Sequence, residues 1–456
     1  MQLRRRRDFE LRKNQQPGIR EHREGEDEIV HCLLVQSPGQ DIRKRKVFPL
    51  NLCYIGTALE NAGHTVEIFD MNVAEDPFGG LRRKAGDGFD VIGVSLRNAD
   101  SQTENLFIRN RNIFWFYKAV KLIKENSNAI LIAGGSGFTL FSREIMEKTG
   151  IDFGIIGEGE RSVCELLENL RDPGSVRGIC YRKNRRVVFT RPASAIHDID
   201  GPVKRDFPGI RLSRYTDHGV QTRRGCRYKC TYCTYSNIQN AEVRYRDPAA
   251  VADEVEELAG HGIRKAWFAD CIFGDNKRQL RGICKGIAAR NLDVSWATYM
   301  RADHADRESI SLMKRSGCSY LEFSPDAGSQ RTLDMLKKEI TVGQIIDCAK
   351  KTRELNTGFM FFLNPPGETV STLSETLRLA AKISSPGRRV LFGLIRIYPH
   401  TELYEQAVRE GIVRPGTNLL EKMQFYNPGP LRYPVMGFLP VYGAYYWLRH
   451  ARGEHF

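Results

Sequence analysis

Three cysteines stand close together in Gly225-Cys226-Arg227-Tyr228-Lys229-Cys230-Thr231-Tyr232-Cys233, a CxxxCxxC loop. A structural zinc ion normally takes four protein ligands, and neither a second cysteine pair nor a nearby histidine completes such a set. A cubane iron–sulfur cluster usually takes four cysteines, so three leave one iron open to another ligand. The amine and carboxylate of a methionine-like group suit that position. The loop therefore predicts a chemically active cluster, with a zinc knuckle or reduced surface cysteines as alternatives.

Composition and charge narrow the class of protein. The chain has 456 residues, 41% of them apolar, which is enough for two or three domains that each bury a core. Its formal net charge is +14, but the cations of residues 1–28 are nearly offset by acids there, so the excess lies in the folded part. We expect a solvated basic surface and no nucleic-acid partner. Eleven scattered cysteines and a charged N-terminus without an apolar core indicate the cytosol.

A first series of strands alternates with helices over residues 29–172, after a charged extension, residues 1–28, that we expect to be disordered. The strand patterns are Val30–Val35, Thr65–Phe69, Val91–Ser95, Ile130–Ala133 and Phe153–Ile156. Five strands with helical crossovers predict a doubly wound, parallel α/β sheet of the Rossmann or flavodoxin type. Ligands of such sheets lie at the carboxyl ends of the strands, where glycine-rich loops follow here.

A second series begins just before the cysteine loop. Residues 173–214 are interpreted as a linker that contains a hairpin, Gly178–Thr190. Residues 215–412 then carry six strand patterns, near Val220 and at Ala266–Ala269, Ser295–Tyr299, Tyr320–Phe323, Gly358–Leu363 and Val390–Ile397. Six such units predict a partial (β/α)6 barrel with its active site at the carboxyl-terminal strand ends. Residues 413–456 form a C-terminal extension.

The cysteine loop and its place after the first barrel strand resemble the radical S-adenosylmethionine (SAM) superfamily. The five-strand domain resembles the cobalamin-binding domain of one large branch of it, and the resemblance covers residues 29 to about 425. In the superfamily a reduced [4Fe-4S] cluster cleaves SAM to methionine and a 5'-deoxyadenosyl radical, which abstracts hydrogen from the substrate. The resemblance implies that Cys226, Cys230 and Cys233 hold the cluster, and that a flavodoxin- or ferredoxin-type protein donates electrons.

Later strand ends resemble the motifs with which the superfamily binds SAM. Tyr232 lies where the adenine packs, and Asp270 where a polar group meets the methionyl amine. Asp326 and Ala327 replace the usual Glu-Ser of a Glu-Ser-Gly motif, so the ribose contact departs from the pattern. The segments Pro365–Thr369 and Arg396–Thr401 match the fifth and sixth strand ends, although His400 replaces a common glycine. The implied SAM-binding residues are Tyr232, Asp270, Arg301, Asp326, Ser329 and Arg396.

The first domain lacks one feature of many cobalamin-binding domains. Those domains give cobalt a histidine from an Asp-x-His-x-x-Gly motif, whereas this chain has Ser37-Pro38-Gly39-Gln40-Asp41-Ile42-Arg43 at that place. The resemblance is therefore to the branch in which no protein imidazole binds cobalt. An empty or repurposed domain is the alternative. The implied cobalamin-binding residues are Ser37, Ser95, Arg97, Asn98, Gly134, Gly135, Ser136, Gly157, Glu158 and Gly159.

The resemblance implies a methyltransferase that acts on an unactivated carbon, or phosphorus, of a natural-product or lipid intermediate, through a 5'-deoxyadenosyl radical and methylcobalamin. A related enzyme for ring contraction, cyclisation or oxidation would transfer no methyl group. A methylthiotransferase would need three further clustered cysteines, and Cys32, Cys53 and Cys164 are dispersed. A non-enzymatic metal-binding module is the remaining alternative. No side chain is assigned to acid–base catalysis.

Three histidines, one further cysteine and an apolar C-terminal stretch are interpreted without a role in the chemistry. His218, His261 and His304 are expected at the surface or at helix caps, and Cys271 as a buried apolar residue. The apolar stretch Val435–Leu448 is too short to span a membrane and contains Pro440. Its aromatic residues suit either an interfacial membrane contact or packing against the barrel.

Overall fold

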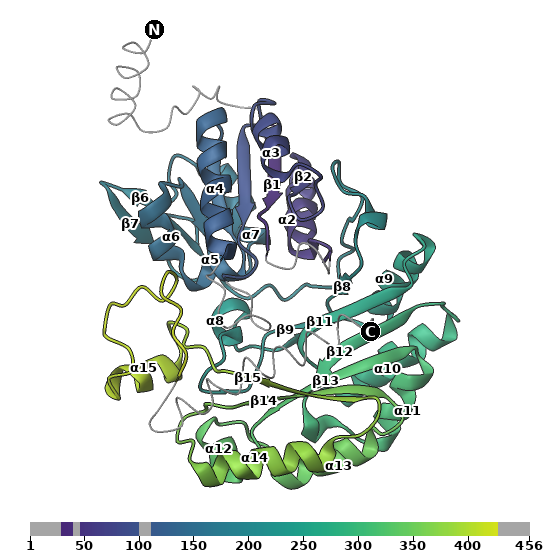
Figure 1. The fold of residues 1–456 in the computed structure, drawn as a ribbon. Helices are drawn as coiled ribbons and strands as arrows, with labels where there is room; N and C mark the ends of the chain where they lie inside the picture. The colour runs from purple at the N-terminus through teal and green to yellow at the C-terminus, as the bar shows by residue number, and fades with distance from the viewer. Residues whose placement is uncertain (1–28, 40–45, 100–110, 427–456) are drawn as a thin grey trace.

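The computed structural model describes residues 29–39, 46–99 and 111–426, which form two lobes (Figure 1). The predicted extension of residues 1–28 and the aromatic stretch of the C-terminus lie outside the described residues. None of the helices within the described ranges combines the length and the apolar character that crossing a bilayer would need.

The N-terminal lobe is built on a seven-stranded sheet with the order β2-β1-β3-β4-β5-β6-β7. The first five strands are parallel, as predicted: β1 (His31–Gln36), β2 (Thr65–Asp70), β3 (Val91–Ser95), β4 (Ile130–Gly134) and β5 (Phe153–Ile155). We assigned the hairpin to the linker, but it extends the sheet. It consists of β6 (Ile179–Lys183) and β7 (Arg186–Phe189), and β6 pairs antiparallel with the edge strand β5. Asn184 and Arg185 turn the hairpin with positive φ angles of 51° and 65°.

Helices cover both faces of this sheet, which confirms the doubly wound architecture. Leu33 and Val35 of β1 face a core shared with α3 (Pro77–Ala85), α4 (Arg111–Asn126) and α6 (Ser142–Thr149). Cys32 and Leu34 face the opposite core, shared with α2 (Leu50–Asn61) and α7 (Glu160–Glu168). Successive residues of a parallel strand point to opposite faces, so an uninterrupted apolar run is what a strand buried on both sides requires. The short helix α5 (Ser136–Leu140) follows β4.

The C-terminal lobe is the predicted partial barrel. Its six parallel strands have the order β15-β14-β13-β12-β11-β8, so β8 and β15 are open edges. The strands are β8 (His218–Val220), β11 (Lys265–Phe273), β12 (Ser295–Met300), β13 (Cys318–Asp326), β14 (Asn356–Phe362) and β15 (Arg388–Gly393). The outer helices are α9 (Pro248–Gly260), α10 (Lys277–Ala289), α11 (Arg307–Arg315), α12 (Gln330–Met335), α13 (Val342–Lys351) and α14 (Val370–Ile383).

The two faces of the barrel sheet differ in their environment. Phe268, Trp296 and Phe323 point to the outer helices and are completely buried, and the first two stack with their centroids 4.6 Å apart. Tyr299 lies on the opposite face of the central strand β12 and remains 37% exposed. Solvent therefore reaches the concave inner face of the barrel, where a parallel barrel of this kind places its chemistry.

Segments outside the two sheets join the lobes. Arg205 of the linker is buried, donates a hydrogen bond of 2.7 Å to the carbonyl of Gly219, and pairs with Glu254 of α9. The chain after β15 runs through α15 (Glu402–Arg409) back to the N-terminal lobe, where Leu420 and Tyr426 share a core with Phe141 (Figure 1). Residues 413–426 of the C-terminal extension are therefore part of the contact between the lobes.

His218 contradicts our expectation of a surface or capping residue. It lies in β8, is 2% exposed, and stacks on the ring of Phe48 from the N-terminal lobe with centroids 5.5 Å apart. Burial, together with the positive charge of Arg205, lowers the pKa of His218 to about 4. The histidine is thus neutral at physiological pH and serves as an aromatic contact between the lobes. His261, by contrast, is exposed at the C-terminal cap of α9, as expected.

This burial predicts an acid-sensitive lobe contact. In the unfolded chain this histidine has an ordinary pKa of about 6.5, so below pH 6.5 it binds a proton that the folded chain resists. The stability is therefore complete above about pH 6.5 and is lost as the pH falls toward 4. We expect this residue to account for up to about 3 kcal/mol of that loss. Unfolding of the His218→Phe variant, followed between pH 7.5 and 4.5, should lose that part of the pH dependence. An unchanged profile would contradict the prediction.

Candidate active site between the lobes

The cysteine loop follows β9 (Arg223–Arg224) and precedes α8 (Tyr235–Gln239). Cys226 is buried, and Cys230 and Cys233 are half-buried. Burial raises the pKa of Cys233 to about 12, and the nearby Cys230 and Cys226 add to this shift, so the three cysteines lie close together. Within the described ranges, no three His, Cys, Asp or Glu side chains converge as ligands of a single metal ion do. A cubane distributes its cysteines over separate irons, and three thiols on one loop fit that arrangement.

Asp270 fixes the strand that enters the loop. Its carboxylate accepts hydrogen bonds from the amide of Thr222 at 2.9 Å, the hydroxyl of Thr222 at 2.5 Å and the amide of Arg223 at 3.2 Å. Burial raises the pKa of Asp270 to about 6, although these bonds oppose the shift. The residue that the motif assigns to the methionyl amine of SAM is therefore also the anchor of the cysteine loop.

Cys271, next along β11, is a neighbour of the loop rather than a purely apolar core residue. It is half-buried, and its thiol donates a hydrogen bond of 3.3 Å to the carbonyl of Gly225. Cys271 also lies beside Cys226, and this proximity lowers the pKa of Cys226. Gly225 has a φ of +80°, and a Cβ there would lie 1.9 Å from the carbonyl oxygen of Glu242, so only glycine fits at this entry to the loop.

Tyr232 and Asp326, two of the predicted SAM contacts, meet at the mouth of the barrel. The Tyr232 hydroxyl donates to Asp326, and the ammonium of Lys338 lies 2.5 Å from Asp326 and 3.2 Å from the Tyr232 hydroxyl. Burial, together with the Asp326 carboxylate, raises the pKa of Tyr232 well above its ordinary value. Burial opposes the charged form of Lys338, but Asp326 and Cys230 outweigh it and raise its pKa. Lys338 was not predicted from the sequence, because a polar Lys337-Lys338-Glu339 run after a helix is typical of a surface.

Arg301 supports the loop from the end of β12. Its guanidinium lies over the ring of Tyr228, 3.7 Å from the centroid, and pairs with Asp303 at 3.0 Å. It also donates to the carbonyl of Lys338 at 2.9 Å. The Tyr228 hydroxyl lies 2.9 Å from Nε2 of His304, so that histidine too differs from our expectation of a surface or capping role. Arg301 thus connects the cysteine loop to the Lys338 turn.

The other two predicted SAM contacts lie apart from this cluster. Ser329 is buried at the start of α12, where its carbonyl accepts the amide of Leu333 at 3.0 Å. Arg396 is buried at the contact between the lobes, where it donates to the carbonyl of Leu419 at 3.1 Å and lies over the ring of Tyr398.

The predicted cobalamin-binding residues fall into three groups at the carboxyl edge of the N-terminal sheet. Ser37 and Ser95 are buried and bonded to each other, with the Ser37 hydroxyl donating to the Ser95 carbonyl at 2.7 Å. Arg97 and Asn98 are exposed, beside the half-buried backbone of Gly134, Gly135, Ser136 and Gly157 and the buried Gly159. Glu158 is ion-paired with Arg224 and Arg244 of the other lobe.

The glycine loops at this edge pack closely against one another. Gly135 has a φ of +99°, and a Cβ on it would lie 2.7 Å from the carbonyl oxygen of Leu96. The loops after β3 and β4 thus touch through their backbones, at a position where only glycine fits. The edge presents glycine backbone beside the exposed polar side chains of Arg97 and Asn98, which suits a corrin held by backbone and polar groups.

Arg97 of the cobalamin edge lies near residues of the cysteine loop and of the barrel. Arg97 retains contact with solvent yet is surrounded by protein, which lowers its pKa, and the nearby Tyr235 and Tyr299 oppose that shift. Tyr235 begins α8 just after Cys233, and Tyr299 lies on the inner face of the barrel. Both tyrosines are more than one third exposed. Residues of the cobalamin edge, the cysteine loop and the barrel are therefore near one another and in contact with solvent.

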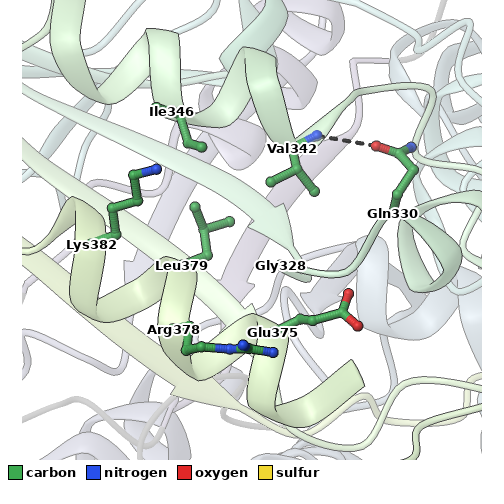
Figure 2. A pocket seen from close by; sticks show the side chains of 8 residues that line it. All are labelled: Gly328, Gln330, Val342, Ile346, Glu375, Arg378, Leu379 and Lys382. Atoms are coloured by element: carbon green, nitrogen blue, oxygen red, sulfur yellow. Dashed lines mark hydrogen bonds between the residues drawn. The ribbon is translucent and has the colours of Figure 1, made fainter. Parts of the chain in front are cut away.

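A separate groove lies on the outer helical layer (Figure 2). Its lining residues are Gly328, Gln330, Val342, Ile346, Glu375, Arg378, Leu379 and Lys382, from α12, α13, α14 and the turn after β13. The side chain of Gln330 accepts a hydrogen bond of 3.1 Å from the amide of Val342 across it. The groove faces away from the inner surface of the barrel and is not part of the site.

Two family models match the chain, in the order that the fold presents. The B12 binding domain matches residues 43–167, and the radical SAM superfamily matches residues 220–380. The first range contains β2 to β5 of the N-terminal sheet, and the second contains β11 to β14 of the barrel. The cysteine loop lies inside the second match.

Relatives of known sequence and structure share this organisation. An uncharacterized methyltransferase of Pyrococcus horikoshii, PH0819, is 26% identical over 84% of each chain. The anaerobic magnesium-protoporphyrin IX monomethyl ester cyclase of Cereibacter sphaeroides is 28% identical over 56% of this chain and 44% of its own. The structure of the radical SAM methyltransferase TsrM from Kitasatospora setae, with cobalamin and a [4Fe-4S] cluster bound, matches with a TM-score of 0.74, at 21% identity over 84% of this chain and 75% of TsrM.

The buried Lys338–Asp326 pair predicts a coupled effect on stability. Lys338→Met leaves the Asp326 carboxylate buried without its cation, which should lower the free energy of unfolding by about 3–5 kcal/mol. The double variant Lys338→Met/Asp326→Asn removes that charge and should recover most of the loss, because asparagine tolerates the φ of +71° at position 326.

Chemical denaturation of the full chain measures both effects. Lys337→Met is the matched control, because the adjacent Lys337 pairs with Glu402 at the surface, where both side chains are about half exposed. It should cost less than about 1 kcal/mol. A double variant less stable than Lys338→Met alone would contradict the account.

Proposed function

Because this chain is a radical SAM enzyme with a B12-binding domain, we propose that it is a methyltransferase acting on an unactivated carbon, or phosphorus, of a natural-product or lipid intermediate. One observation carries the proposal: Arg97 of the cobalamin edge lies near Tyr235, beside the cysteine loop, and near Tyr299 of the barrel. A substrate bound beside these three residues would lie within reach of both cofactor sites.

The [4Fe-4S] cluster supplies radical cleavage of SAM, and cobalamin carries a methyl group. The residues of this chain bind and orient. Cys226, Cys230 and Cys233 would hold the cluster, while Asp270 and Arg301 keep their loop in place through Thr222 and Tyr228. Tyr232, Asp326 and Lys338 would help to hold SAM. Arg97, Asn98 and the glycine loops would hold the corrin.

A second candidate is a radical enzyme that uses the same two domains without methyl transfer. The similarity to the magnesium-protoporphyrin ester cyclase, at 28% identity over about half of this chain, favours it. The similarity to PH0819 extends over 84% of each chain and favours methylation. Product mass decides between them, because methylation adds one carbon and releases S-adenosylhomocysteine, whereas cyclisation does neither.

The electron donor we propose is a small acidic protein of the flavodoxin or ferredoxin type. Arg227 and Lys229 are both exposed on the cysteine loop, on either side of the half-buried Tyr228. Two cations this close to the cluster would attract an acidic partner to the point where the electron enters. An oxygen-sensitive cluster and eleven free cysteines support the cytosol as the compartment. We also keep the peripheral membrane contact of the C-terminal aromatic stretch as a proposal.

The cluster assignment predicts which cysteines carry iron. After anaerobic reconstitution with iron and sulfide, the Cys226→Ala, Cys230→Ala and Cys233→Ala variants should each lose most of the bound iron, because each removes one ligand. Cys271→Ala is the matched control, since that thiol lies beside Cys226 without being a ligand, and it should retain iron. Iron and acid-labile sulfide analysis tests this, and loss of iron only in Cys271→Ala would overturn the assignment.

The donor assignment predicts a salt-sensitive partner effect. Arg227→Glu/Lys229→Glu should slow flavodoxin-driven SAM cleavage on the order of tenfold at low ionic strength. Dithionite-driven cleavage should be unchanged, because a small reductant needs no docking surface. Arg378→Glu/Lys382→Glu, on the outer groove of Figure 2, is the control for reversing two exposed cations. Equal slowing with both reductants would contradict a docking role.

A further inference from the structure

One loop of the N-terminal lobe forms ion pairs with residues on both sides of the cysteine loop. This loop, Gly157–Glu160, follows β5 at the carboxyl edge of the sheet. Upstream of the cysteines, Arg224 lies 3.4 Å from Glu158 and 2.6 Å from Glu160. Downstream, Arg244 pairs with Glu158 and donates a hydrogen bond of 2.9 Å to the carbonyl of Gln239, the last residue of α8. The segment from Arg224 to Gln239, which contains all three cysteines, is thus held at both ends.

The charges of these ion pairs are buried and balanced. The side chains of Glu158, Arg224 and Arg244 are 5–6% exposed, and Glu160 is 18% exposed. Both guanidinium NH groups of Arg244 bind Glu158, one to each carboxylate oxygen, which is the two-point geometry that fixes direction as well as distance. Two carboxylates face two guanidinium groups, so no net charge is buried.

The Nε donor and the flat face of the Arg224 guanidinium also have partners. Its Nε donates to the side-chain oxygen of Gln221 at 2.8 Å, and its guanidinium lies over the ring of Tyr54 on α2, 4.9 Å from the centroid. The side chain is therefore constrained from three directions, two of them in the N-terminal lobe. Because Arg224 stands two residues before Cys226, this constraint passes directly to the first cysteine.

Cohesion between the lobes does not depend on these ion pairs. The apolar core that Phe141 shares with Leu420 and Tyr426 already joins them. Buried ion pairs add little net stability compared with apolar contacts of the same size, because desolvation offsets their attraction. What they do supply is a single allowed geometry, since any other arrangement leaves a charge unpaired. Their effect is thus on the relative placement of the two edges.

We propose that Glu158 is a positioning residue which, through Arg244 and Arg224, sets the distance and orientation between the cysteine loop and the cobalamin edge. The inference rests on the proposed function, because it takes the loop to hold the cluster and the edge to hold the corrin. Glu158 was predicted from the sequence to contact the corrin itself. Its two oxygens instead receive the two arginines and the amide of Ile196, at 3.3 Å.

The first test uses hydrogen exchange in the full chain without cofactors. Glu158→Gln removes the charge, and Glu158→Gln/Arg244→Gln removes one charge of each sign, so the second variant leaves no additional unpaired charge. In both variants we expect amides of residues 224–239 to exchange on the order of tenfold faster, while β13 and β14 keep wild-type rates. Glu165→Gln is the control, because Glu165 lies on α7 and pairs with Arg161, whose side chain is 73% exposed.

The second test measures placement directly in the loaded protein. Cob(II)alamin and the reduced cluster each carry unpaired electron spin, so the magnetic coupling between them reports their separation. We expect one narrow distribution of couplings in the wild type and in Glu165→Gln. Both Glu158 variants should give a broad distribution at unchanged iron and corrinoid content.

Two results would overturn the inference: unchanged exchange over residues 224–239 in both Glu158 variants, or an unchanged distribution of couplings. Faster exchange throughout the chain, β13 and β14 included, would also overturn it, because it would show that Glu158 serves stability alone. A wild-type chain that takes up no corrinoid would defeat the proposed function, and the exchange experiment would still decide whether Glu158 holds the cysteine loop.

Discussion

The buried pairing of Glu158 and Glu160 with Arg224 and Arg244 is the constraint on which the site depends. A parallel sheet presents its loops at one edge, and this molecule has two such sheets, each with its carboxyl edge toward the other. Apolar contacts also hold the lobes together. Charged groups buried between the edges allow one alignment, and that alignment places the cysteine loop opposite the exposed Arg97.

The interior of the site follows from this alignment. Asp270 and Arg301 each serve the cysteine loop through a neighbour, Thr222 in one case and Tyr228 in the other. Side chains that resemble ligand contacts are thus also the supports of the loop that carries the cluster ligands. The Tyr232–Asp326–Lys338 group closes the same end of the barrel with its own buried charge pair. The buried charged groups of these side chains are paired or hydrogen-bonded, because an unpaired buried charge is costly.

The sequence predicted the sheets well and the contacts between them poorly. Buried parallel strands require uninterrupted apolar runs, so the strands from Val91 and from Ser295 began where expected. The pairing of the hairpin with β5 could not be predicted, because the residues of a hairpin do not indicate which edge of a sheet it will join. Glu158 was placed on the correct edge, but its partners lie 66 and 86 residues further along the chain. Lys338 and His218 were misjudged or missed because burial of a polar residue is a property of the fold rather than of its neighbours in sequence.

The central claim is that this chain joins a radical-forming cluster to cobalamin for methyl transfer. The measurement that tests it most directly is anaerobic reconstitution with iron, sulfide and cobalamin, followed by addition of SAM and a strong reductant and quantification of bound corrinoid, 5'-deoxyadenosine and S-adenosylhomocysteine. The account predicts bound corrinoid and formation of both nucleosides, with cleavage lost in Cys230→Ala. Absence of cleavage, or cleavage undiminished in Cys230→Ala, would contradict it.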